Sequence, residues 1–173
     1  MSTTCSAMTA SLHVSAGALD AAHAILAEAR KLFESRNERL STAYVIYLDA
    51  TVLDREGHPE EALARYQEAA AMAGPASPVS TEMGVRIGWS LGRLGRHDES
   101  RARLETSLDL AVAAGELRAV ADASALLAAD HVRRGEDEEA CTRLSESLDA
   151  LAELARGLSP VTRARAVSVR AFA

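Results

Sequence analysis

Glycines that recur at nearly constant intervals are the feature that most constrains the fold of this chain. Each is followed by a stretch rich in acidic residues and alanine, as in "REGHPEEALARYQEA" and "RRGEDEEACTRLSES". The four glycines are separated by 40, 38 and 40 positions: Gly17, Gly57, Gly95 and Gly135. A near-constant period of roughly 20 to 50 residues indicates an array of repeated structural units.

The residue types around each glycine keep one register. Small residues stand seven positions before it (Ala10, Ala50, Gly88, Ala128) and five positions after it (Ala22, Ala62, Ser100, Ala140). Large residues stand nine positions after it: Leu26, Tyr66, Leu104 and Leu144. Two antiparallel helices joined by a short turn pack closely where the facing residues are small. We therefore predict that each glycine joins two helices, with the small residues between them and the large residues between neighbouring pairs.

The composition agrees with a chain made of helices. Hydrophobic residues make up 48% of the sequence but aromatic residues only 3%, and Ala, Leu, Glu and Arg are strong helix formers. No stretch alternates apolar and polar residues as a strand would. We predict an all-α domain over residues 1–173, with about four helix-turn-helix repeats and a final lone helix. The nine helices run from residues 3–15 to residues 161–172.

The repeated units resemble tetratricopeptide (TPR) repeats. The second unit carries the matching pattern: Ala50, Gly57, Ala62, Tyr66, Ala69 and Pro75. The resemblance implies a right-handed α-solenoid, in which helix pairs stack into a superhelix. The period is longer than the roughly 34 residues of that repeat, and Ile46 and Gly84 stand where an aromatic residue is usual. Longer units of this kind resemble the sensor arrays of bacterial transcription regulators.

The charge and the termini argue against several classes of protein. The net charge is -6 and the pI about 5.4, which disfavours direct nucleic-acid binding. The start of the chain lacks a basic and apolar signal sequence, and no segment approaches the roughly 20 apolar residues of a membrane span. Cys5 and Cys141 match no metal or redox spacing. We expect a soluble, cytoplasmic protein with two free thiols.

The sequence carries no motif of an enzyme or a cofactor site. His13 and His131 both stand four residues before a turn glycine, at a core position, and His23 stands alone on a second helix. The glycines of "GWSLGRLG" match no phosphate-binding loop, so we interpret them as close packing and a turn. We predict no catalytic residue, no metal site and no cofactor.

The resemblance implies that the first helix of each pair lines a concave groove. Counted back from the turn glycines, the candidate binding residues are Tyr44, Tyr47, Arg55, Arg86, Trp89, Arg93, Arg133 and Arg165. Tyr, Trp and Arg are enriched at binding hot spots. We predict that the groove binds a protein or peptide segment, an acidic one where the arginines contact it. Alternatively, the aromatic residues pack in the core between pairs and the arginines are only solvated.

Three other functions remain open. The chain could be a fragment of a regulator that senses a small molecule or a peptide. It could be a self-assembling module that forms a homodimer through an exposed terminal helix. The third alternative is an enzyme of unusual type on a helical scaffold.

Overall fold

The computed structural model describes residues 19–74 and 77–157. These residues form seven α-helices: α2 (Leu19–Ser35), α3 (Arg39–Glu56), α4 (Pro59–Ala73), α5 (Pro78–Arg93), α6 (His97–Ala114), α7 (Leu117–Arg134) and α8 (Asp137–Gly157). No strand occurs in these two ranges. The all-α helical-repeat prediction is confirmed. The helices predicted at residues 3–15 and 161–172 lie outside the described residues.

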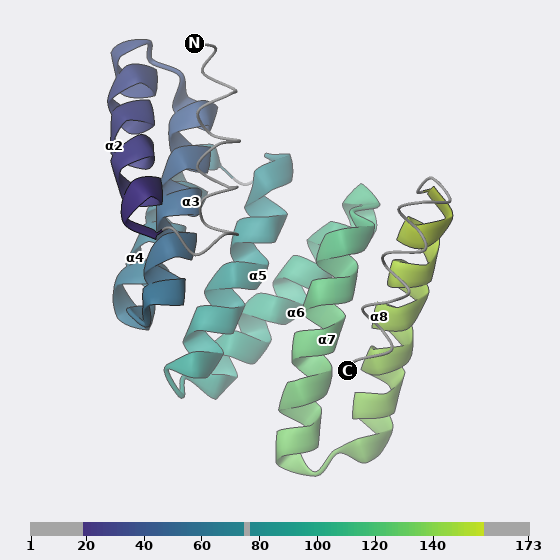
Figure 1. Ribbon diagram of the computed structural model, residues 1–173. Helices are drawn as coiled ribbons and strands as arrows, with labels where there is room; N and C mark the ends of the chain where they lie inside the picture. The colour runs from purple at the N-terminus through teal and green to yellow at the C-terminus, as the bar shows by residue number, and fades with distance from the viewer. Residues whose placement is uncertain (1–18, 75–76, 158–173) are drawn as a thin grey trace. The chain divides into compact units, whose positions relative to one another are not determined.

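The chain divides into two compact units, Met1–Arg103 and Leu104–Ala173, and α6 crosses the boundary between them. Within the first unit α2 packs on α3, α3 on α4 and α4 on α5. Within the second unit α7 and α8 form an antiparallel pair, as Figure 1 shows. Consecutive helices therefore pack as neighbours, which is the arrangement that the repeat pattern predicts. One continuous domain over residues 1–173 stays a prediction.

In the pairs that the structure describes, the turn glycines Gly57, Gly95 and Gly135 follow the first helix, as predicted. Gly57 has a φ of 86° and follows the last residue of α3. Its N–H donates to the carbonyl oxygen of Asp54 at 3.3 Å, and the N–H of His58 donates to that of Leu53 at 3.0 Å. This left-handed conformation suits glycine, which has no Cβ. Pro59 then takes the first position of α4, where a missing N–H costs least.

The short links between pairs use a second set of left-handed residues, which the period of the turn glycines does not reveal. Asn37 has a φ of 55° between α2 and α3, and Gly115 has a φ of 69° between α6 and α7. Asn is among the few residues with a side chain that adopt this conformation readily. The chain therefore turns at alternating sites, one inside each pair and one between pairs.

The small residues that were predicted to face each other are buried. Ala50 and Ala62 lie between α3 and α4, and neither is exposed to solvent. Ala128 and Ala140 are buried in the same way in α7 and α8. Their burial agrees with the prediction that these positions form the contact within each pair, since α3 packs on α4 and α7 on α8.

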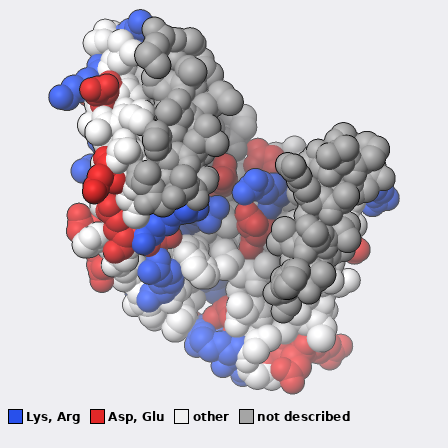
Figure 2. All heavy atoms as spheres, in the orientation of Figure 1, with Lys and Arg blue, Asp and Glu red and all other residues white. Residues whose placement is uncertain are grey.

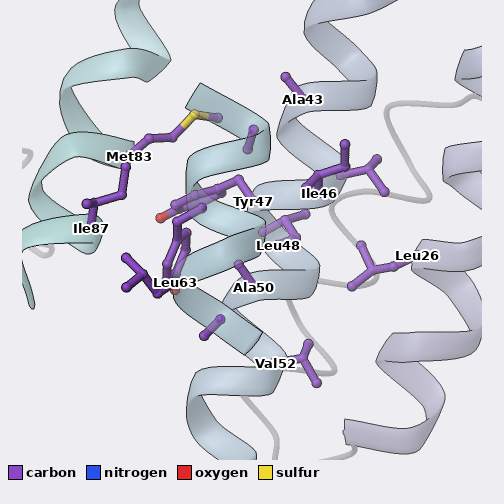
Figure 3. Packing of buried hydrophobic residues seen from close by; sticks show 14 of the residues in the cluster. Leu26, Ala43, Ile46, Tyr47, Leu48, Ala50, Val52, Leu63, Met83 and Ile87 are labelled. Carbon is purple, nitrogen blue, oxygen red and sulfur yellow. The ribbon is translucent and has the colours of Figure 1, made fainter. Parts of the chain in front are cut away.

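The core of the first unit surrounds α3, which has eight buried residues. Such a helix is apolar on most of its sides because it packs against α2, α4 and α5. Figure 3 shows the Tyr47 side chain extending from α3 toward Met83 and Ile87 of α5, with Leu63 of α4 below. Leu26 of α2 belongs to the same cluster. This packing fixes the position of α3 relative to α5.

Of the large residues that were predicted to lie between neighbouring pairs, three are buried and one is not. Leu26, Tyr66 and Leu104 are buried, whereas Leu144 is 46% exposed. Leu26 and Tyr66 belong to the core cluster of the first unit, where side chains of neighbouring helices cover them. The residues after α8 lie outside the described part of the chain, and α8 also exposes Leu148 and Leu151.

Candidate binding face on α3 and α5

The structure places most of the predicted groove residues on two helices of the first unit. Tyr44, Tyr47 and Arg55 belong to α3, and Arg86, Trp89 and Arg93 belong to α5. The two helices contact each other directly. We call these six residues, together with Asp54 and Glu82, the α3–α5 face. Arg133 lies on α7 in the second unit, and Arg165 lies outside the described residues.

The tyrosines of this face differ in depth. Tyr44 is 38% exposed and stacks on Tyr47, with ring centroids 5.9 Å apart and an interplanar angle of 24°. Tyr47 is only 6% exposed, and its ring centroid lies 5.7 Å from that of Tyr66. Tyr44 therefore exposes part of its ring to solvent, while Tyr47 supports it from the core.

Hydrogen bonds fix the two buried tyrosines. The Tyr47 hydroxyl donates to Oε1 of Glu82 on α5 at 2.7 Å, and the Tyr66 hydroxyl donates to Oγ1 of Thr51 on α3 at 3.2 Å. Burial and the neighbouring Glu82 carboxylate raise the pKa of Tyr47, against the opposing effect of Arg86. The Tyr47 hydroxyl stays protonated and serves as a donor that joins α3 to α5.

Trp89 is the second half-exposed aromatic residue of the face. It is the only tryptophan in the chain and is 40% exposed. A large indole ring in water loses the free energy that its burial would supply, and such rings often become the centre of a binding site. Trp89 and Tyr44 are thus the residues of this face whose rings a ligand can cover.

The arginines of the predicted groove are paired more fully than the sequence indicates. Arg93 forms an ion pair with the Asp54 carboxylate, and its Nη1 also donates to the Asp54 main-chain oxygen at 3.3 Å. Arg133 contacts Asp130 at 2.5 Å, and Arg134 contacts the same carboxylate at 3.2 Å. Figure 2 accordingly shows basic and acidic side chains lying next to each other. The α3–α5 face combines both signs of charge.

Two hollows lie elsewhere in the described residues. One, of about 300 Å³, lies between α2 and α3, with Leu26, Val45 and Ile46 among its lining and His23, Arg30 and Asp49 as its polar residues. The other, of about 430 Å³, lies within the second unit, beside Leu108, Val112 and the Arg143–Glu146 ion pair. Neither is lined by a residue of the α3–α5 face.

Two of the described histidines contact carboxylates at hydrogen-bond distance. His131 is buried, as predicted from its position, and its Nδ1 lies 2.6 Å from Oε2 of Glu136. His23 was expected to stand alone but contacts two carboxylates of α3, those of Asp49 and Glu56. The repeat register already places position 23 on the helix that precedes α3, and this was the available signal.

Neither a metal centre nor a membrane-crossing helix is found among the described residues. They contain no cluster of three or more His, Cys, Asp or Glu side chains arranged to hold a metal ion. None of the described helices combines the length and the apolar composition that a membrane crossing requires. No protein-family model matches the chain, and no curated protein matches it in sequence. A functional argument therefore depends on the α3–α5 face itself.

Proposed function

We propose that the chain is a non-enzymatic, TPR-like repeat protein that binds a protein or peptide segment on the α3–α5 face. The observation that carries this proposal is the pair of half-exposed aromatic rings, Tyr44 and Trp89, on two helices in contact. Aromatic rings on a rigid surface supply most of the affinity in many interfaces.

The residues beneath the face support the mechanism. Tyr47 stacks under Tyr44 and is hydrogen-bonded to Glu82 of α5. The Arg93–Asp54 ion pair joins the C-terminal ends of the same two helices. Because these two contacts hold α3 against α5, one from the middle of α3 and one from its C-terminal end, little conformational entropy is lost when a ligand binds. The rings act as preformed contacts.

The charges of the face favour a peptide of mixed character. The face carries the positive charges of Arg55 and Arg86 beside the negative charges of Glu82 and the partly buried Asp54. Charge complementarity therefore selects where a ligand's acidic groups lie, and burial of the two rings provides the affinity. The proposed ligand is a segment with an apolar or aromatic residue near an acidic one.

A peptide-display selection tests the proposal. A library of random linear peptides is selected on immobilised wild-type protein and depleted on the Tyr44→Ser/Trp89→Ser variant. The control is Val132→Ser, which removes an apolar side chain that is 58% exposed on α7. We expect peptides that bind the wild type and the control but not the double variant. Peptides that bind all three proteins equally would exclude this face.

A further inference from the structure

A chain of charged side chains links α2, α3 and α4 within the first unit, away from the α3–α5 face. It begins at Glu56 of α3, and its second member is His23 of α2. Its Nδ1 lies 3.0 Å from Oδ1 of Asp49, and its Nε2 lies 3.1 Å from Oε2 of Glu56. The second oxygen of Asp49 lies 3.7 Å from Nε of Arg65 on α4. The imidazole thus lies between two carboxylates of α3.

The chain of charges continues from Arg65 back to α2. Arg65 contacts Glu68 at 2.8 Å, Glu68 contacts Arg30 at 2.9 Å, and Arg30 contacts Glu34 at 2.8 Å. Read from Glu56 to Glu34, the signs alternate at every step only if His23 is positively charged.

The hydrogen-bonding capacity of the imidazole ring also favours the positively charged state of His23. A neutral imidazole has one N–H donor and one acceptor nitrogen, whereas an ionised carboxylate only accepts. Two carboxylates on the two ring nitrogens are both satisfied only by imidazolium. In the neutral ring one nitrogen lone pair would face a carboxylate oxygen at about 3 Å, which is repulsive.

We propose that His23 is a proton-dependent clamp, which holds α2 against α3 when the imidazole is charged and loosens this contact when it is neutral. The device is independent of peptide binding on the α3–α5 face. The groups that face it are Asp49 and Glu56 of α3, and Arg65 of α4 acts on it through Asp49.

The electrostatics agree in sign with this geometry. Burial is the largest single effect on the pKa of His23 and lowers it, but the hydrogen bonds to Glu56 and Asp49 and the negative charges of these carboxylates together outweigh it, so the pKa is raised above 6.5. A pKa that is raised in the folded state adds stability below the unfolded value. This contribution is present below pH 6.5 and is lost as the pH rises through the folded pKa.

The first test is the titration of His23 by NMR between pH 5 and pH 9. This range runs from about 1.5 units below to about 2.5 units above an ordinary histidine pKa. His23→Gln identifies the resonances. We expect a pKa above 6.5 in the wild type, and a lower value in the Asp49→Asn/Glu56→Gln variant. A wild-type pKa at or below 6.5 would overturn the clamp.

The second test measures the melting temperature of His23→Gln against wild type over the same pH range. The matched control is Arg30→Gln, because Arg30 belongs to the same network but does not titrate there. The loss caused by His23→Gln should be largest near pH 6 and shrink toward pH 9, while the loss caused by Arg30→Gln stays constant. A loss at His23 that does not change with pH would contradict the proposal.

Discussion

Ser100 of α6 donates its side-chain hydroxyl to the main-chain carbonyl oxygen of Gly88 on α5, at 2.7 Å. Both residues occupy the small positions of the repeat, five after and seven before the turn glycine Gly95. The hydroxyl is buried and satisfied by the backbone that it approaches. A small polar residue therefore occupies the position that alanine occupies in the α3–α4 and α7–α8 pairs.

This contact predicts an interaction between Gly92 and Ser100. A Cβ added to Gly92 would lie 3.2 Å from Oγ of Ser100, but 3.9 Å from its Cβ. The substitution Gly92→Ala should therefore destabilise the wild-type protein more than it destabilises the Ser100→Ala variant. We expect a coupling of roughly 0.5–1 kcal/mol in a double-mutant cycle measured by urea unfolding. Additive effects would show that a Cβ at position 92 does not contact the Ser100 side chain.

Ala62→Arg tests the contact between α3 and α4. Ala62 has no exposed surface, so a long charged side chain would overpack the contact and bury a charge. The overpacking alone should cost about 1–3 kcal/mol, and the desolvated charge adds to this. The control is Ala64→Arg, which makes the same change at an exposed position of α4. Equal melting temperatures for the two variants would contradict the repeat register, which assigns Ala62 to the contact between α3 and α4.

Substitutions at Gly57 test the turn between α3 and α4. No atom lies within 4 Å of a Cβ added there, so the cost of a substitution comes only from its φ of 86°. Gly57→Ala should lower the free energy of unfolding by about 1–2 kcal/mol. Gly57→Asn should lower it less, because Asn tolerates the left-handed region. The reverse order in denaturant unfolding would show that the turn relaxes to another conformation.

The two buried tyrosines should differ when they lose their hydroxyls. Tyr47→Phe removes a donor from the Glu82 carboxylate, a bond to a charged group worth roughly 1.5–3 kcal/mol. Tyr66→Phe removes a bond between two hydroxyls, worth roughly 0.5–1.5 kcal/mol. Urea unfolding should therefore rank Tyr47→Phe as the more destabilising variant. The opposite ranking would mean that Glu82 does not hold the Tyr47 hydroxyl in solution.

The parts of the fold that depend on local conformation were predictable from the sequence. A glycine such as Gly57 marks a left-handed turn, and small residues such as Ala50 and Ala62 mark close approach, because few other residue types satisfy these conditions. The burial of Leu144 was predicted wrongly, since it requires another segment to pack on α8 and is not a property of α8 alone.

The candidate site was predictable only in part. Helix periodicity places Tyr44 and Tyr47 on one side of α3, but the burial of Tyr47 depends on side chains from α5, Met83 and Ile87. Ion pairs such as Arg93–Asp54 join residues far apart in the sequence, and the period aligns helices without fixing which charges meet. His23 was missed for the same reason.

The central claim is that ligands cover Trp89 on the α3–α5 face. Its indole is the only one in the chain, so tryptophan fluorescence during titration with a selected peptide reports on this face alone. We expect a blue shift of the emission and protection from acrylamide quenching. Trp89→Ala should weaken binding by about 2 kcal/mol or more, roughly 30-fold in Kd, with little change in melting temperature. Unchanged emission on binding, with full affinity and a lowered melting temperature in Trp89→Ala, would contradict the claim and place Trp89 in the core.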